Sequence, residues 1–244
     1  NMHAVSVTGR PWHELDRALL ECRPLIGVLT DHVHTPRAIA KRMMEYHLDK
    51  DYTMRVAEHL GNPKKEKIYN IYSIEEISEM SFSCPNCVLL MKAPNSTQQR
   101  PALGIPDTKF VLLNDRAKMI TKAPIRVIDL SLLELHNSRT FWDIGACTGS
   151  VSIEARRQYP HLNIQAFEVR EECKDIIRAN ARLQSAPGID LHIGNFLNLP
   201  IAEDAIVDAV FIGFSHDGQY YRFCRSDGRG AHSLSAFTTG FFHY

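Results

Sequence analysis

The apolar positions of residues 1–92 alternate between two periods, which predict strands and helices in turn. Short apolar runs at Leu25–Leu29 and Val88–Met91 are typical of buried strands. Apolar residues three or four positions apart predict a helix over Trp12, Leu15, Leu19 and Cys22. Because strands and helices alternate, we expect a small α/β domain with a largely parallel sheet.

Capping residues mark two further helices in this half. Thr35 is a good N-cap and Pro36 suits the first helical position, so a helix should run to about Tyr46. Ser73 and Glu76 form a capping-box pattern that predicts a short helix. Both helices are therefore expected from local signals.

The apolar pattern stops at residues 93–104, which are polar, contain two prolines and have no period. We interpret them as a linker between domains at 1–92 and 105–244. In the second domain Thr121 is expected to cap a helix that has Pro124 in its first turn and ends near Asn137. The core-facing stripe of this helix is expected at Ile125, Ile128, Leu132 and Leu135.

The segment from Thr140 to Glu154 reads as a buried strand, a glycine turn and the start of a helix. Gly145 and Gly149 permit a turn in which the backbone approaches a ligand closely. The turn predicts a nucleotide-like ligand. A glycine turn without a ligand is the alternative that this motif leaves open.

The composition of the chain limits the partners and the cellular location to be expected. The chain has 244 residues, 44% of them hydrophobic, and 28 basic residues balance 28 acidic ones. This balance gives no reason to expect nucleic acid or an anionic membrane as a partner. No apolar run approaches the ~20 residues of a membrane span, and the six cysteines are scattered. We expect a soluble, cytoplasmic protein.

Two patterns in the first half have the spacing of metal ligands. Cys84 and Cys87 lie three apart, and His32 and His34 lie two apart. A zinc site needs four ligands, and no second cysteine pair follows at a suitable distance. Small residues at a strand entry and loop histidines are the favoured interpretation, and no metal is expected.

The glycine spacing separates two cofactor classes. The dinucleotide pattern G-x-G-x-x-G would need glycine at Cys147 and Ser150. An acid followed by alternating glycines, present at Asp143, Gly145 and Gly149, resembles S-adenosylmethionine-dependent methyltransferases instead. Glu168, which ends the next expected strand, follows Gly149 by 19 residues, near the ~20 typical of a ribose-binding acid.

Segments of the first half resemble the second half of the tetrapyrrole methylase fold. They are SVTGR at 6–10, VLTDHVHTPRAIA at 28–40 and EHLG at 58–61. More narrowly, they resemble cobalamin-pathway precorrin methyltransferases that act on carbon 5 of the corrin ring. That family binds its cofactor in a cleft between two domains, of which only the second is expected here, and the resemblance implies that Thr30 and Asp31 line the cleft. A strand-end turn in which Asp31 bonds its own backbone is the alternative.

Segments of the second half resemble the decarboxylating methyltransferases that act on carbon 15. They are GIPD at 104–107, MITK at 119–122, SLLEL at 131–135, WDIGACTGSVSIEA at 142–155 and FIG at 211–213. Both activities are fused in the precorrin-6Y C5,15-methyltransferases. The resemblance implies a Rossmann-like class I methyltransferase sheet. It also implies methylation of a precorrin at carbons 5 and 15, with decarboxylation of the ring C acetate, in cobalamin biosynthesis.

The resemblance implies contacts with S-adenosyl-L-methionine along five segments. One residue, Thr121, precedes the first helix of the second domain. Asp143 holds the loop, and the glycine turn surrounds the methionine part of the cofactor. Glu168 binds the ribose, and the GNF segment at 194–196 lies beside the adenine. The implied contacts are Thr121, Asp143, Gly145, Ala146, Cys147, Thr148, Gly149, Glu168, Asn195 and Phe196. Cys147 stands where the family usually has glycine, and its thiol is expected to be packed rather than reactive.

Arg116 and Lys122 are candidates for binding the carboxylates of the tetrapyrrole. Surface solvation is the alternative for both. The chemistry asks mainly for alignment of an already activated methyl group with a ring carbon. No residue is identified as a general base.

The C-terminus departs from the family pattern. Asp208–Ile212 predicts a fourth strand, only 31 residues follow Gly213, and the stretch from Cys224 onwards has no strand or helix period. We expect a truncated sheet with an unpaired edge, which a second chain in a homo-oligomer could cover. A remnant that binds the cofactor without turnover and a nicotinamide-dependent oxidoreductase are the alternative functions.

Overall fold

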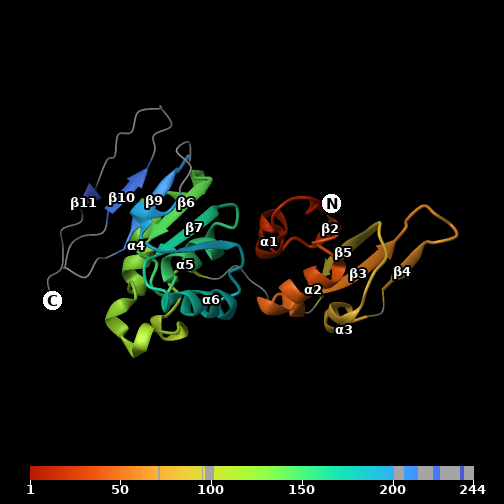
Figure 1. The fold of residues 1–244 in the computed structure, drawn as a ribbon, viewed down its shortest axis with the longest axis horizontal. Coiled ribbons are helices and arrows are strands. Elements are labelled where there is room, and N and C mark those ends of the chain that lie inside the picture. The colour runs from red at the N-terminus through yellow and green to blue at the C-terminus, as the bar shows by residue number, and fades with distance from the viewer. Residues whose placement is uncertain are drawn as a thin grey trace. The chain divides into compact units, whose positions relative to one another are not determined.

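The computed structural model describes residues 1–70, 72–94, 96, 102–200 and 206–213, with the backbone alone of two short strands beyond them. The chain divides into two compact units, Asn1–Arg100 and Pro101–Tyr244 (Figure 1). The boundary falls inside the segment that the sequence marks as a linker. Each unit has its own buried core.

In its described residues, the first unit is a five-stranded sheet with three α-helices. Its strand order is β1-β2-β5-β3-β4, with bounds β1 His3–Ser6, β2 Leu25–Leu29, β3 Tyr52–Glu58, β4 Lys67–Tyr69 and β5 Asn86–Lys92. Only β1 and β2 pair in parallel, and the other three pairs are antiparallel. The expectation of a largely parallel sheet is therefore wrong for this unit, because β3 and β4 form a hairpin and β5 runs antiparallel between β2 and β3.

The helices of the first unit are α1 His13–Leu20, α2 Pro36–Glu45 and α3 Ile74–Glu79, of which α2 and α3 begin where their capping residues indicate. The Thr35 hydroxyl accepts the Ala38 N–H at 3.2 Å. Ser73 and Glu76 bond each other's backbone N–H, which confirms the capping box.

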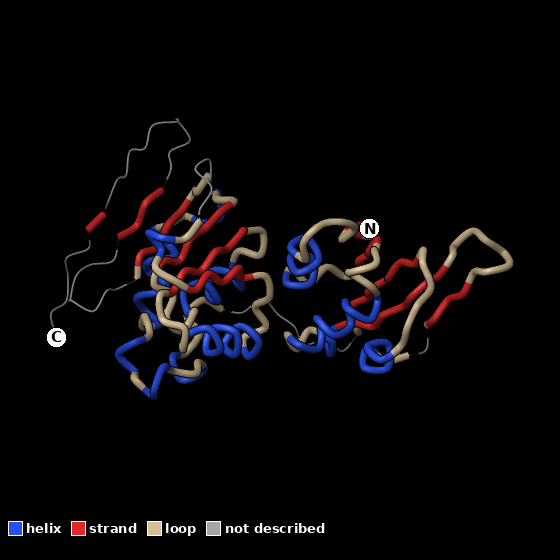
Figure 2. Tube along the Cα trace, in the orientation of Figure 1, coloured by secondary structure: helices blue, strands red, loops and turns tan. Residues whose placement is uncertain are grey.

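The second unit is built on four parallel strands. The sheet order is β11-β10-β9-β6-β7-β8, with bounds β6 Thr140–Ile144, β7 Asn163–Glu168, β8 Ile189–Ile193, β9 Ala209–Ile212, β10 Arg222–Arg225 and β11 Phe237–Thr238. Strands β9, β6, β7 and β8 are parallel, and the strands of this sheet lie side by side as red segments in Figure 2. The chain runs outward from β6 through β7 and β8, then returns to β9 on the other side of β6. Ligands of open α/β sheets bind at the carboxyl ends of the strands where such a reversal occurs.

The outer edge of β9 is paired, because β10 lies antiparallel to it and β11 pairs with β10. The expected unpaired edge after the fourth strand is therefore wrong. Both added strands lie partly or wholly in the stretch from Cys224 that shows no period. Strands this short are below the length at which a pattern can be read.

Helices α4 Ala123–Leu132, α5 Ser150–Gln158 and α6 Cys173–Leu183 accompany the parallel strands. Three expectations for α4 are wrong. The helix ends at Leu132 and not near Asn137, because Glu134 has a left-handed backbone and Leu135–Asn137 form a separate 3-10 helix. Lys122 rather than Thr121 is the N-cap, and its side chain makes no capping hydrogen bond; the Ala123 N–H is instead accepted by Asp107 Oδ1 at 3.0 Å. The buried face carries Arg126, Asp129, Leu130 and Leu133, whereas Ile128 and Leu132 are more than half exposed.

The buried guanidinium of Arg126 explains why α4 turns a different face to the core from the one that its apolar residues predict. It lies 3.1 Å from the fully buried carboxylate of Glu154 on α5 and 2.8 Å from Asp107, and it also donates to the carbonyls of Thr121 and Ile105. Glu154 in turn accepts the Gly104 N–H at 2.5 Å. This ion-pair network turns a polar residue into the core and joins the GIPD segment to both helices.

Candidate cofactor site

The turn after β6 lies across the end of β7. The N–H groups of Gly145 and Ala146 both donate to the carbonyl of Phe167, at 2.8 and 3.0 Å. The carbonyl of Ile144 accepts the Gly213 N–H at 2.7 Å, so β9 ends against the same turn. The turn is therefore held by the two strands that flank β6.

Glycine is required at both positions, Gly145 and Gly213, where the turn after β6 meets the end of β9. A Cβ on Gly213 would lie 2.8 Å from the Gly145 carbonyl oxygen, and one on Gly145 would lie 3.2 Å from the Gly213 oxygen. Gly145 and Gly149 also have φ angles of +82° and +73°, which residues with a side chain rarely adopt. At Gly149 a Cβ would lie 3.0 Å from Ile177 of α6, so this glycine lets α5 and α6 pack closely.

Glu168, at the end of β7, faces the turn. Its carboxylate is buried, and Oε2 accepts the Cys147 N–H at 2.8 Å. Arg170 lies on the same carboxylate, donating from its backbone N–H and Nε to Oε1 at 3.0 and 2.8 Å and from Nη2 to Oε2 at 3.1 Å. Burial raises the pKa of Glu168, but the hydrogen bonds and charge of Arg170 outweigh it and hold the pKa below its usual value.

Asp143, on β6, is fully buried beneath the start of α5. Its Oδ2 accepts the N–H and hydroxyl of Ser152 at 3.1 and 2.5 Å. Within the described residues its Oδ1 has no hydrogen-bond partner. Burial, reinforced by the nearby charge of Glu168, raises the pKa of Asp143 to about 6.

The remaining residues of the turn are buried. Ala146, Cys147 and Thr148 expose less than a tenth of their surface. Cys147 has a φ of +49° and packs in a cluster with Leu113 and Cys173, and burial raises the pKa of its thiol. A buried thiol of raised pKa is a packing group rather than a nucleophile.

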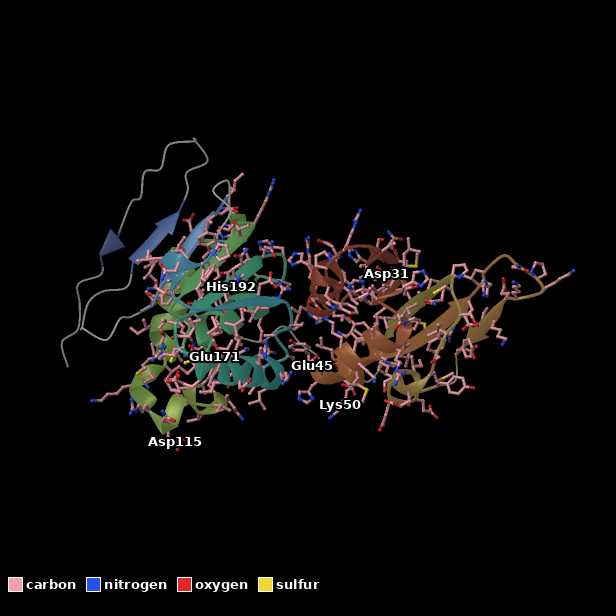
Figure 3. The ribbon with its side chains drawn as sticks, viewed as in Figure 1. Asp31, Glu45, Lys50, Asp115, Glu171 and His192 are labelled. Carbon is pink, nitrogen blue, oxygen red and sulfur yellow. The ribbon has the colours of Figure 1, made fainter. Side chains whose placement is uncertain are left out.

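The GNF segment lies next to the end of β7. Gly194 N–H donates to the Glu168 carbonyl at 2.9 Å. The Phe196 ring packs edge-on against Phe167, 5.0 Å away, and Trp142, 5.9 Å away. Asn195 is exposed, and its side-chain oxygen accepts the Leu197 N–H at 3.1 Å, which leaves its amide donors for a ligand. His192 on β8, labelled in Figure 3, stacks on Phe167 at 4.9 Å.

The segment before α4 contains three candidate residues, Thr121, Lys122 and Arg116, and their contacts differ. Thr121 contributes its carbonyl to Arg126. Lys122 Nζ donates to the Ala117 carbonyl at 2.5 Å and lies 3.6 Å from Asp107. Arg116 is exposed on the stretch that follows Leu113, which packs in the same cluster as Cys147. Both substrate candidates have exposed side chains, and they differ in that the Lys122 ammonium group already has two partners.

Thr30 and Asp31 line a pocket of about 400 Å³ within the first unit, which also includes His32 and Cys84. Asp31 accepts the N–H groups of Val33 and His34 at 2.9 and 2.5 Å and that of Gly9 at 2.8 Å. Asp31 thus bonds the backbone of its own turn, as the alternative expects, and its place in a cleft between two domains stays a prediction. Across the described ranges no three His, Cys, Asp or Glu side chains are grouped to hold a metal ion.

Sequence reasoning missed Arg126 and Arg170. Arg126 was hidden because it occupies a helix face that the apolar stripe assigned elsewhere. Arg170 follows the acid of β7 by two positions, and a basic residue this close to a ribose-binding acid is the signal that could have found it.

Comparison with known proteins supports the resemblance seen in the sequence. Residues 113–227 match the family model described as a precorrin methyltransferase domain. The cobalt-precorrin-6B C(15)-methyltransferase (decarboxylating) of Salmonella typhimurium is 38% identical over 96 residues, 39% of this chain and 48% of that protein. The precorrin-6Y C(5,15)-methyltransferase [decarboxylating] of a Sinorhizobium species is 27% identical over 212 residues, 86% of this chain and 49% of that protein.

A crystal structure of precorrin-6Y C5,15-methyltransferase from Geobacter metallireducens is 35% identical, with a TM-score of 0.43, and the match covers 49% of this chain and 62% of that one. The chain spans about half the length of the curated relatives it matches. The resemblance to precorrin methyltransferases is confirmed. In the part of the chain that the structure describes, no helix is both long and apolar enough to cross a bilayer.

Proposed function

We propose that the second unit binds S-adenosyl-L-methionine at the turn after β6 and that the chain transfers methyl groups to a precorrin. The reaction is methylation of ring carbons 5 and 15 with decarboxylation of the ring C acetate. The observation that carries the proposal is the contact between Glu168 and the Cys147 N–H, 2.8 Å long. It places a buried carboxylate against a glycine turn at the reversal point of the sheet, where a ribose would be recognised.

The charges around the turn suit a cationic ligand. Asp143 and Glu168 are both buried and close enough for each charge to affect the other, and the single cation bonded to them in the described part of the unit is Arg170. A sulfonium or ammonium group would offset the remaining negative charge. The cofactor supplies an activated methyl group, which a ring carbon can accept when the two lie in line.

The protein's contribution is therefore to position rather than to activate. Gly145 and Gly149 allow the backbone to approach the methionine part, Glu168 fixes the ribose, and Asn195 with Phe196 flanks the adenine. Arg116 is the candidate for holding carboxylates of the tetrapyrrole, with Lys122 second because it already has partners. Homo-oligomerisation is a separate prediction, which sedimentation of the chain would check.

Transfer of labelled methyl groups to a precorrin pool tests this proposal. The wild-type chain is expected to incorporate label and release carbon dioxide, and Glu168→Ala is expected to lose both. Binding of S-adenosylhomocysteine by a folded wild-type chain without transfer would replace the proposal with the alternative, a chain that binds cofactor without turnover. Binding of NAD in its place would point to an oxidoreductase, which Cys147 and Ser150 disfavour.

A further inference from the structure

Arg170 occupies the carboxylate on which the proposed function depends. A glutamate side chain has two oxygens and about four acceptor positions. In this structure four donors fill them: the Cys147 N–H and three groups of Arg170. The carboxylate that would receive ribose hydroxyls is therefore already saturated.

The three participants differ in their freedom to move. Glu168 and Cys147 are buried, and the Arg170 N–H is fixed by the backbone. The Arg170 guanidinium is attached to a long side chain that is 31% exposed. It can therefore leave for solvent by side-chain rotation, whereas the other donors cannot leave without moving the turn.

We propose that the Arg170 guanidinium competes with the cofactor ribose for Glu168 and thereby sets the affinity of the site. Nε and Nη2 each bond one carboxylate oxygen, as two ribose hydroxyls would. Binding exchanges these two bonds for two bonds to the ribose, and the guanidinium becomes hydrated. The affinity is then lower than the site would give if Arg170 were absent. This inference rests on the proposed function.

A second effect acts in the same direction. Arg170 is the cation that compensates Glu168, next to the buried Asp143. Without it, two buried carboxylates are left uncompensated, and a ligand that carries an ammonium group gains more from binding. Removal of the guanidinium should therefore tighten binding, whereas a purely structural role would predict weaker or unchanged binding.

Calorimetric titration of the whole chain with S-adenosylhomocysteine tests the inference. Arg170→Ala is expected to bind about tenfold tighter than wild type, the order expected when bonds to a charged group no longer have to be broken. Arg170→Lys keeps the charge but cannot bridge both oxygens, so its affinity should lie between the two. Lys174→Ala, which removes an exposed cation paired with Glu171, is the matched control and should bind as wild type does.

The possible outcomes distinguish failure of this inference from failure of the proposed function on which it rests. If wild type binds, and both folded variants of Arg170 bind equally or more weakly, the competition is refuted and the site stands. If neither wild type nor Arg170→Ala binds while both are folded by circular dichroism, the proposed function fails, and the inference fails with it. If Arg170→Ala does not fold, Arg170→Lys alone decides, because unchanged or weaker binding overturns the competition.

Discussion

Asp143 and Glu168 are carboxyl groups on either side of the same turn, yet their surroundings shift their pKa values in opposite directions. Glu168 has a guanidinium and two backbone N–H groups on its oxygens, so its pKa falls. Asp143 has only Ser152, and burial raises its pKa to about 6. Ionisation of the buried Asp143 therefore carries an electrostatic cost.

Asp143→Asn should stabilise the second unit at alkaline pH. The folded pKa of about 6 lies above the ordinary value of 3.8, so the stability that protonation adds is complete below pH 3.8 and is lost as the pH rises through 6. At pH 8 the wild type bears the full cost, up to about 3 kcal/mol, and the amide bears less. The free energy of unfolding should then favour Asp143→Asn by about 1–3 kcal/mol at pH 8, with no advantage near pH 4.

Trp142 fluorescence in a Trp12→Phe background measures this difference in the second unit alone, since Trp12 and Trp142 are the two tryptophans of the chain. An advantage that does not change between pH 8 and pH 4 would show that the buried charge is not its cause.

At the scale of residues, the sequence predicted that Glu168 faces the glycine turn, as the structure shows. Glu168 could be found because the interval between a glycine turn and a ribose-binding acid reflects the length of a strand and a helix. Arg170 could not be assigned to Glu168, because the reach and rotamer of a long side chain leave no periodic signal. The same holds for the burial of Cys147, which depends on Leu113 and Cys173 from other segments.

At the scale of elements, Arg126 joins three segments that are distant in sequence. Its guanidinium holds α4 against Glu154 of α5 and against Asp107. Arg126→Met should leave the Glu154 carboxylate buried without its cation, which costs about 3–5 kcal/mol. Urea unfolding of the second unit measures the loss. Arg178→Met, on the exposed face of α6, is the control and should change stability by less than about 0.5 kcal/mol. Equal effects of the two changes would contradict the ion-pair network.

The close approach of β6 and β9 predicts a second difference between matched variants. An added Cβ meets a backbone oxygen at 2.8 Å in Gly213→Ala, but in Gly27→Ala it meets the flexible end of Met2 at the same distance. Gly213→Ala should cost about 1–3 kcal/mol because two strand ends must separate, and Gly27→Ala should cost less. Thermal unfolding of both variants checks the order, which the reverse ranking would contradict.

Elements with local signals were predicted well, and elements that depend on distant pairing were not. Thr35 and Ser73 cap α2 and α3 through bonds within three residues. Strand β3 was missed although Tyr52, Met54 and Val56 are buried and alternate with polar positions, as in a strand covered on one face. The antiparallel pairing of the first sheet is set by contacts between strands, which the order of elements does not encode.

At the scale of the whole molecule, the chain holds two sheets with separate cores and different pairing patterns. The second has a reversal of strand order at β6, the kind of point at which open α/β sheets bind ligands. Strands β6, β7 and β9 of this unit were predicted from their apolar residues, whereas β8, in which Asp190 and His192 alternate with apolar residues, was not. The addition of β10 and β11 was not predictable, because both strands are short and pair antiparallel at the edge of the sheet.

Equilibrium binding of S-adenosylhomocysteine to wild type and to Glu168→Gln tests the central claim most directly. We predict one saturable site per chain for wild type and binding at least tenfold weaker for Glu168→Gln, since hydrogen bonds to a charged acceptor are worth about 1.5–3 kcal/mol. Glu172→Gln, an exposed glutamate next to α6, is the control and should bind as wild type does. No binding by the folded wild-type chain, or equal affinities for wild type and Glu168→Gln, would contradict the account.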